Sequence, residues 1–477
     1  MSGKRYSGDV STHSVVSNSI TDGPLWKGLL RFFFPLVFGA FFQQLYNTVD
    51  AIVVGQFVGK EALAAAGGGS AVYANLLIGF FMGVSSGATI IVAQYFGAAR
   101  NVRLSRTIHT AVALAACAGI VFSVLGAWLA PFSMRIIGTP ESVFAGSVLY
   151  LRIFFIGMLP MFVYNMCAGI MQALGDSKTP FYILVVGCGA NIVLDLLFVA
   201  VVKGGVAGAA WATVLSQTFC MVLSLLKLHR LPAAYRLSVQ KLRFTPSELS
   251  RTVRLGLPAG IQSSLYAVSN LIIQGYINSF DTDVVAAWAV YMRVDGLFWM
   301  AVSSFGVAMT TCVGQNYGAG KIERVFRATR EGLWMMSAVA VISTLVLWFF
   351  GQYIFLLFTS DAAVISAGMH LLKFLVPFLI TYIPIEVLSG TIRGSGETFK
   401  PMIITLLGIC ALRIIWLVAA VPFWHTIRMV AASYPVTWIV TSVAFFIYYA
   451  RRTWLHEPGG RAHLDGRLSS PAEQPEQ

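Results

Sequence analysis

Long apolar segments recur along this chain, and they constrain its fold more than any other feature. Each exceeds about 18 residues, the length at which a hydrophobic segment can cross a bilayer as a helix. Because the bilayer core holds no water, backbone N–H and C=O groups must be satisfied within the spanning structure. We predict twelve transmembrane helices, at 28–57, 61–97, 104–130, 142–173, 180–202, 205–228, 249–280, 284–317, 326–358, 362–393, 400–422 and 428–450. The expected fold class is an all-α integral membrane protein.

Composition and charge support this interpretation. Hydrophobic residues make up 57% of the chain and charged residues 11%, whereas soluble domains carry roughly 25% charged residues. The net charge of +13 would suggest a nucleic-acid partner in a soluble protein, but here it marks cytoplasmic loops, in which Lys and Arg accumulate. With the N-terminus inside, the outer loops hold only Lys60, Arg135, Lys203 and Arg428. We therefore expect a multi-pass inner-membrane protein with both termini in the cytoplasm and no nucleic-acid partner.

The chain is also an internal duplication. VAQYFGAAR at 92–100 returns 221 residues later as VGQNYGAGK at 313–321, and GDSKTP at 175–180 returns at the same offset as GETFKP at 396–401. Two pairs of segments with one offset indicate a tandem repeat. Because six helices return the chain to the same side, the two repeats should be related by an axis along the membrane normal.

The repeat divides the chain into five regions. A polar, basic stretch at 229–248 separates the halves and is predicted to be a cytoplasmic linker. We predict an N-lobe of helices 1–6 at 25–228 and a C-lobe of helices 7–12 at 249–453. Residues 1–24 are expected to be a cytoplasmic segment without a cleaved signal peptide, and residues 454–477 a disordered cytoplasmic tail.

Two acidic residues inside the first half are the strongest functional candidates, because burying a charge in lipid costs several kcal/mol. Asp50 and Asp195 each lie about seven residues from the outer end of their helices, hence both roughly 10 Å deep. Tyr46, Asn191 and Thr213 lie near them at helical spacing. Such a cluster can share a proton or coordinate a small hard cation such as Na⁺ through oxygen atoms. Simple interhelical hydrogen bonding is the alternative, and two carboxylates at one depth favour an ion-coupling site.

The duplication provides a test of this site. At the 221-residue offset Asp195 corresponds to Trp416, and Asp50, with a shift of one residue, corresponds to Asn270. The second half therefore lacks the carboxylates, and coupling should be confined to the first lobe. Arg152 corresponds to Lys373, so a cation recurs in helices 4 and 10.

The second half carries its own ionisable residues within apolar segments. Asp295 and Lys373 lie at similar depth in the outer half of the membrane, while Glu386 and Arg413 lie in the inner half. We predict that these form structural ion pairs, Lys373 with Asp295 and Glu386 with Arg413, and we place Arg293 and Arg152 among the structural cations. A second proton or substrate-cation site at Asp295 or Glu386 is the alternative.

Other reactive residue types indicate no catalytic site. The six cysteines all lie inside predicted helices without metal-type spacing, and they are interpreted as packing residues. The seven histidines show no HExxH pattern. We therefore expect that the protein is not an enzyme and needs no cofactor beyond a coupling ion.

Several of these segments resemble a known family. QQLYNTVDAIVVGQFVG at 43–59, GATIIVAQYFGAA at 87–99, NIVLDLLF at 191–198 and GVAMTTCVGQNYGAG at 306–320, together with GDSKTP, look like the multidrug and toxic compound extrusion (MATE) transporters, particularly their bacterial DinF-like branch. The motifs occur in order at the appropriate helices. The resemblance covers about 25–453.

The resemblance implies a fold of two six-helix bundles of the MATE/MOP-superfamily type around a central cavity. It implies a monomeric antiporter in the lipid membrane that exports amphipathic, often cationic, drug-like compounds in exchange for inward H⁺ or Na⁺. The implied ion-coupling residues are Asp50, Asn191, Asp195 and Thr213, which are also the possible Na⁺ ligands. The implied cavity residues are Tyr46, Asn47 and Asn165, and we add the acids Asp295 and Glu386.

Three other functions remain open at this point. A flippase for a lipid-linked or other amphiphilic metabolite would share the repeats, but flippases of this superfamily usually carry two further C-terminal helices. A membrane-embedded enzyme and a channel or receptor are the remaining candidates. The sequence does not choose between H⁺ and Na⁺, because both suit the same oxygen cluster.

Overall fold

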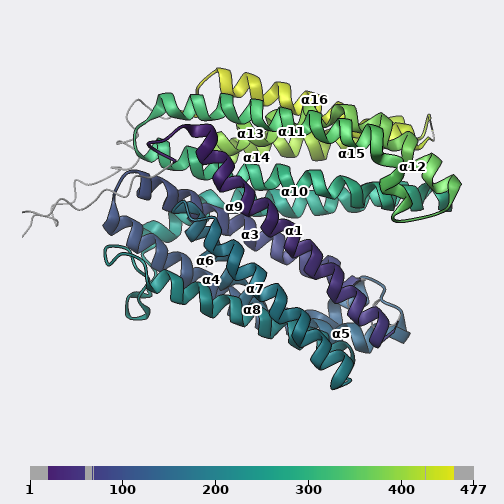
Figure 1. The fold of residues 1–477 in the computed structure, drawn as a ribbon, viewed down its shortest axis with the longest axis horizontal. Helices are drawn as coiled ribbons and strands as arrows, with labels where there is room; N and C mark the ends of the chain where they lie inside the picture. The colour runs from purple at the N-terminus through teal and green to yellow at the C-terminus, as the bar shows by residue number, and fades with distance from the viewer. Residues whose placement is uncertain (1–19, 60–66, 68, 425, 456–477) are drawn as a thin grey trace, which may run out of the picture.

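The computed structural model describes residues 20–59, 67, 69–424 and 426–455, and within these ranges all regular structure is helical (Figure 1). Most of the predicted N-terminal segment and C-terminal tail lies outside the described residues. The 229–248 linker lies at one end of the helix bundle, which is called the linker end below, and the opposite end is called the far end. The linker end is the one that the charge pattern predicts to be cytoplasmic.

The first half contains six predicted spans, and their described residues are almost entirely helical. The elements are α1 (Leu25–Phe57), α3 (Gly69–Gly97), α4 (Asn101–Ile136), α5 (Glu141–Ile156), α6 (Met158–Ala173), α7 (Lys178–Asp195), the π-helical turn η1 (Leu196–Val201) and α8 (Gly205–His229). The linker contains the 3₁₀ turn η2 (Val239–Lys241).

The second half follows the same order. Its elements are α9 (Pro246–Ile277), α10 (Thr282–Gly318), α11 (Ile322–Leu356), α12 (Ala362–Leu375), the 3₁₀ turn η3 (Val376–Phe378), α13 (Leu379–Gly394), α14 (Phe399–Thr405), the π-helical turn η4 (Leu406–Ala411), α15 (Leu412–Ala420) and α16 (Ile427–Ala450). The prediction of an all-α membrane protein built from two six-helix repeats is confirmed.

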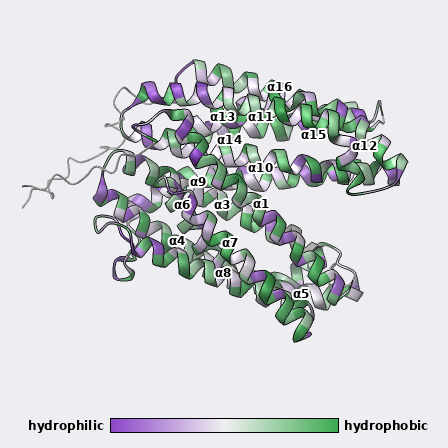
Figure 2. Cartoon of the chain, in the orientation of Figure 1, coloured by the Kyte–Doolittle hydropathy of each residue, from purple (hydrophilic) through white to green (hydrophobic). Residues whose placement is uncertain are grey.

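Hydropathy along these helices agrees with membrane insertion. Ten described helices, some joined across a short turn, are long and apolar enough to span a bilayer, and the pair α5 and α6 forms an eleventh span if it is counted as one. The remaining predicted span is α9, which is continuous but begins with a polar and basic turn. Figure 2 shows hydrophobic residues along most of the helix lengths, with many hydrophilic residues at the linker end.

Two predicted spans are interrupted at prolines. Helices α5 and α6 meet at Gly157 with a bend of 46°. Pro160 has no N–H to donate to the carbonyl of Ile156, so the helical hydrogen-bond ladder is broken there. Pro377 likewise cannot donate to Lys373, and the chain forms the 3₁₀ turn η3 between α12 and α13.

Helix α1 belongs to both lobes. Near the linker end, Leu29 and Phe33 lie in the hydrophobic core of the second half, where the ring of Phe33 contacts Phe305 edge-on at 5.5 Å between centroids. Near the far end, Val53 and Val54 pack against α8 and η1 of the first half. This helix crosses between the lobes in Figure 1, so it packs in the second half near the linker end and in the first half near the far end.

Helix α9 repeats this arrangement with the lobes exchanged. Leu255 lies in the core of the first half, and near it Thr107 of α4 donates a hydrogen bond of 3.2 Å to Glu248. Toward the far end, Ile273 and Ile277 lie in the core of the second half. At the linker end each lobe is thus built partly from the first helix of the other.

Candidate functional site

The structure brings the predicted ion-coupling residues together inside the first lobe. Asp195 is the last residue of α7 and is fully buried, and its carboxyl group interacts with that of Asp50 from α1. Asn191 lies one helical turn before Asp195 and is also buried. Beside them, Tyr46 Oη donates to Thr213 Oγ1 at 3.4 Å. Residues from three helices therefore surround one pair of carboxylates.

Several oxygen atoms of this cluster are buried without a hydrogen-bond partner among the described residues. They include both carboxylate oxygens of Asp195, Oδ1 of Asp50 and the amide oxygen of Asn191. Burying unpaired carboxylate oxygens is costly, so the cluster favours a proton or a cation that neutralises its charge. Carboxylate and amide oxygens are the ligands that small hard cations prefer. The residues present therefore fit either H⁺ or Na⁺.

The backbone changes helix type at this cluster. Directly after Asp195, α7 passes into the π-helical turn η1, a feature that is frequent at functional sites. The second half also has a π-helical turn in the corresponding helix, but at a different position. This turn, η4, comes before Arg413, whereas the residue equivalent to Asp195 is Trp416, which lies after it. The two halves thus differ in backbone geometry as well as in their acidic residues.

Sequence reasoning missed Tyr150 at this site. Its phenol lies close enough to Asp50 and Asp195 to interact with both charges. Tyr150 is nine residues from the start of α5, so a comparison of depths with Asp50 could have found it. The nearby Arg152, predicted as a structural cation, has an exposed side chain instead. Asn165 on α6 donates within its own helix, to the carbonyl of Met161 at 2.8 Å.

The predicted ion pairs of the second half are wrong. Asp295 is buried and accepts a hydrogen bond of 2.6 Å from Trp299 Nε1, whereas Lys373 has an exposed side chain. Glu386 pairs with Arg393 of its own helix at 3.4 Å, and not with Arg413. Depth in the membrane does not specify which face of a helix a residue occupies, so the sequence could not choose these partners.

Arg413 is held by neutral groups instead. Its guanidinium lies over the ring of Tyr434, at 4.0 Å from the centroid, and donates to Thr437 Oγ1 at 3.2 Å. Arg152 and Arg293 have exposed side chains. None of the ion pairs within the described residues includes Arg152, Arg293, Lys373 or Arg413.

The duplicated motif closes the linker end. Gln94 Nε2 donates to the carbonyl of Gly394 at 2.9 Å, and Gln315 Nε2 donates to the carbonyl of Ala173 at 2.7 Å. The two donor residues are 221 positions apart in the sequence, and so are the two acceptor residues. These are therefore two copies of one contact between the lobes. Both glutamines are buried.

The glycines of the motif allow this contact. They end α3 and α10, and Gly97 lies so close to the carbonyl oxygen of Gln315 that an added Cβ would overlap it. Gly318 has the same relation to the carbonyl oxygen of Gln94. Arg251 of α9 adds a further contact at this end, donating a hydrogen bond of 2.9 Å to Gln94 Oε1. The contact of these glycines across the lobes appears only in the structure.

A groove lies between α1 and α10, away from the linker end. It has a volume of about 470 Å³, and its lining consists of Gln44, Asn47, Thr48, Ala51, Ile52, Gly55 and Gln56 of α1 with Arg293 of α10. Asn47, a predicted cavity residue, is therefore on this groove, whereas Tyr46 and Asp50 occupy another face of α1, toward the first lobe. Helix α1 thus presents polar residues both to this groove and to the carboxylate cluster of the first lobe.

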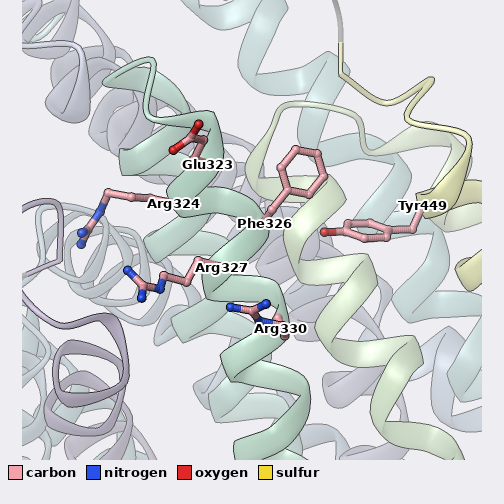
Figure 3. Close-up of a pocket in the computed structure, with 6 residues that line it drawn as sticks. All are labelled: Glu323, Arg324, Phe326, Arg327, Arg330 and Tyr449. Carbon is pink, nitrogen blue, oxygen red and sulfur yellow. The ribbon is translucent and has the colours of Figure 1, made fainter.

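A second cavity, of about 490 Å³, lies at the linker end of α11 and α16. Figure 3 shows Arg324, Arg327 and Arg330 along α11, with Phe326 and Tyr449 on the other side. Arg327 pairs with Glu331 at 3.4 Å. These basic residues lie where the positive-inside rule predicts the cytoplasmic surface.

Two lobes of duplicated membrane helices, joined at one end and with unpaired carboxylates inside one lobe, define a two-lobe membrane transporter. The sequence profile of the MatE family matches this chain twice, at residues 35–197 and 258–418, once in each half. The chain belongs to the MatE family.

Individual relatives agree with this assignment. The chain is 28% identical over 451 residues to "Probable multidrug resistance protein YoeA" of Bacillus subtilis, with 92% of this chain and 97% of that one covered. It is 25% identical to "Probable multidrug resistance protein NorM" of Geobacillus kaustophilus, with the same coverage. Among solved structures, "Outward-facing conformation of a multidrug resistance MATE family transporter of the MOP superfamily" has a TM-score of 0.85 at 21% identity, covering 92% of this chain and 98% of that one.

Proposed function

We propose that this protein is a secondary active antiporter that exports amphipathic organic compounds in exchange for inward H⁺ or Na⁺. The observation that carries the proposal is the double role of α1. One face of this helix brings Asp50 to the carboxylate cluster, while another lines the groove with Asn47. Binding at the cluster and binding in the groove therefore act on the same helix. The names of the relatives, which refer to multidrug resistance, agree with drug-like substrates.

Alternating access follows from the way the lobes are joined. The glutamine contacts hold the linker end closed, so the groove opens toward the far end, which is the predicted outer side. When H⁺ or Na⁺ enters the cluster, its negative charge falls and α1 repacks against α7 and α8. Substrate affinity in the groove then decreases, and the substrate leaves outward. Such coupling requires only that the ion bind the two states with different affinity.

The carboxylates provide the test. Asp50→Asn and Asp195→Asn should each reduce ion-driven dye efflux by at least about a hundredfold, because an amide cannot take up or release the coupling charge. Efflux is measured in proteoliposomes under an imposed pH gradient and, separately, an imposed Na⁺ gradient. The gradient that drives the wild type identifies the coupling ion.

Asp283→Asn is the matched control. Asp283 is an exposed carboxylate in the first turn of α10, far from the cluster in the sequence and not part of it. This variant should transport at the wild-type rate. Full transport by both Asp50→Asn and Asp195→Asn would refute the role of the carboxylate pair.

A further inference from the structure

We propose that Arg293 selects substrates with an acidic group, so that the groove between α1 and α10 binds amphipathic carboxylates and zwitterions in preference to their uncharged or purely cationic analogues. This inference rests on the proposed transport function and names the substrate class for the same groove. It differs from the prediction that Arg293 is a structural cation.

Arg293 lies too deep to serve as an interfacial anchor. It is eleven residues from the start of α10 at Thr282, which at 1.5 Å per residue places it about 16 Å from that helix end. Asn47 lies ten residues from the end of α1 at Phe57, or about 15 Å. The two residues thus share one depth across the groove. Arginines that reach the membrane surface with their side chains lie near helix ends.

The charge of Arg293 is not neutralised by any carboxylate among the residues that the structure describes. Its side chain is exposed, and within the described residues no carboxylate pairs with it. Asp295 is only two residues away, but side chains at this spacing do not share a helix face. Asp295 is buried and bonded to Trp299. A buried acid and an exposed cation therefore lie on different sides of α10.

The remaining lining of the groove is neutral. Gln44, Asn47, Thr48 and Gln56 supply hydrogen-bonding groups, while Ala51, Ile52 and Gly55 supply apolar contact. Arg293 is the one ionised group among these lining residues. A guanidinium presents two parallel N–H donors that match a carboxylate, and it repels cations. The volume of about 470 Å³ lies in the range of sites for small organic molecules.

Opposite charges on the two sides of α1 add to this selectivity, because the carboxylate cluster lies on one side of this helix and Arg293 of α10 lies across the groove on the other. A cationic compound would be attracted to the carboxylates behind α1 and repelled by Arg293 across the groove. A zwitterion meets Arg293 with its carboxylate and leaves its cationic part toward the α1 side. The groove thereby orients a zwitterionic amphiphile, whereas a simple cation gains no such fit.

The experiment compares two dyes that differ in one group. Rhodamine B carries a free carboxylate, and its ethyl ester does not. Efflux of both dyes is measured in the same proteoliposome preparation of the full chain, and the result is the ratio of acid to ester efflux at subsaturating concentrations. We expect Arg293→Gln to lower this ratio about tenfold, which corresponds to about 1.4 kcal/mol of selectivity. Arg293→Lys keeps the charge and should keep the ratio within about threefold.

Arg327→Gln is the matched control, because Arg327 is a cation at the linker end of α11. It should leave the ratio unchanged. An unchanged ratio in Arg293→Gln overturns the inference while the proposed transport function stands. If Arg293→Gln moves neither dye, Arg293→Lys decides: a retained preference supports the inference and a lost preference overturns it. If the wild type moves neither dye under either ion gradient, the proposed function fails, and this inference with it.

Discussion

Replacing Gln315 by leucine should open the linker end of the transporter. Leucine is similar in size to glutamine but lacks the Nε2 donor that contacts the carbonyl of Ala173 at 2.7 Å. That carbonyl lies at the end of α6, and the contact is completely buried. In the closed arrangement the substitution leaves a buried acceptor without this donor, whereas in an arrangement with parted lobes water can replace it.

The expected magnitude follows from this difference. An unsatisfied buried acceptor costs about 1–3 kcal/mol, and the cost falls on the closed state alone. A shift of about 2 kcal/mol changes the ratio of closed to open protein about thirtyfold. If about 1% of the wild type were open at the linker end, about 20% of the variant would be open.

Thiol labelling measures this shift. Ala93 of α3 is 1% exposed and lies against Gly314 of α10, so a cysteine at position 93 reports on the separation of these helices. Cys117, the exposed native cysteine, is first replaced by serine. In Ala93→Cys protein, maleimide labelling from the linker side follows the open fraction, so it should become about twentyfold faster when Gln315→Leu is added.

Thr329→Val is the control for loss of a buried hydrogen bond. Thr329 bonds to Thr391 at 3.0 Å within the second lobe, so its removal does not favour separation of the lobes. Labelling at position 93 should then stay at the wild-type rate. Equal labelling rates with and without Gln315→Leu would refute the role of the duplicated glutamines as an inter-lobe contact.

Two further predictions concern stability. Gly256→Ala should destabilise the protein by about 1–3 kcal/mol, because the added Cβ would overlap the carbonyl oxygen of Val84. Gly275 has open space around it, so the control Gly275→Ala should be neutral or stabilising. Thermal unfolding in detergent measures both variants, and equal midpoints would contradict the close packing of α3 on α9. The ion pair with Lys321, at 2.7 Å, lowers the pKa of Asp22 below 3.8. The pair therefore stabilises the folded protein fully above pH 3.8, and this stabilisation is lost as the pH falls through the lowered pKa that Asp22 has in the folded protein. The difference in melting temperature between wild type and Asp22→Asn should therefore decrease as the pH is lowered below 3.8, and a difference that does not change with pH would contradict this.

The sequence predicted the architecture because the bilayer leaves few alternatives. A long apolar segment in lipid must be a helix, so segment counting was sufficient to define twelve spans. The 221-residue repeat then predicted two lobes, and the family profile matches each half separately. Even the interruption near Pro160 has a local cause, since proline removes a donor wherever it stands in a helix.

The candidate site was only partly accessible to the same reasoning. Asp50 and Asp195 could be placed at one depth because depth depends on residue count along a helix, and the structure brings their side chains together. The partners of Asp295 and Glu386 could not be predicted. They depend on how each helix is rotated and which neighbour it contacts, and local donors such as Trp299 compete successfully with distant charges.

The sequence by itself determined that this protein is a duplicated bundle of membrane helices in which the pair Asp50 and Asp195 occurs in the first half only, because hydropathy and repetition are properties of the chain. Only the tertiary structure decided that α1 and α9 are each shared between the lobes, that Gln94 and Gln315 close the linker end, and that Arg293 faces Asn47 across a groove. These contacts join residues far apart in the chain. They arise from helix rotation and crossing, and no local pattern encodes either.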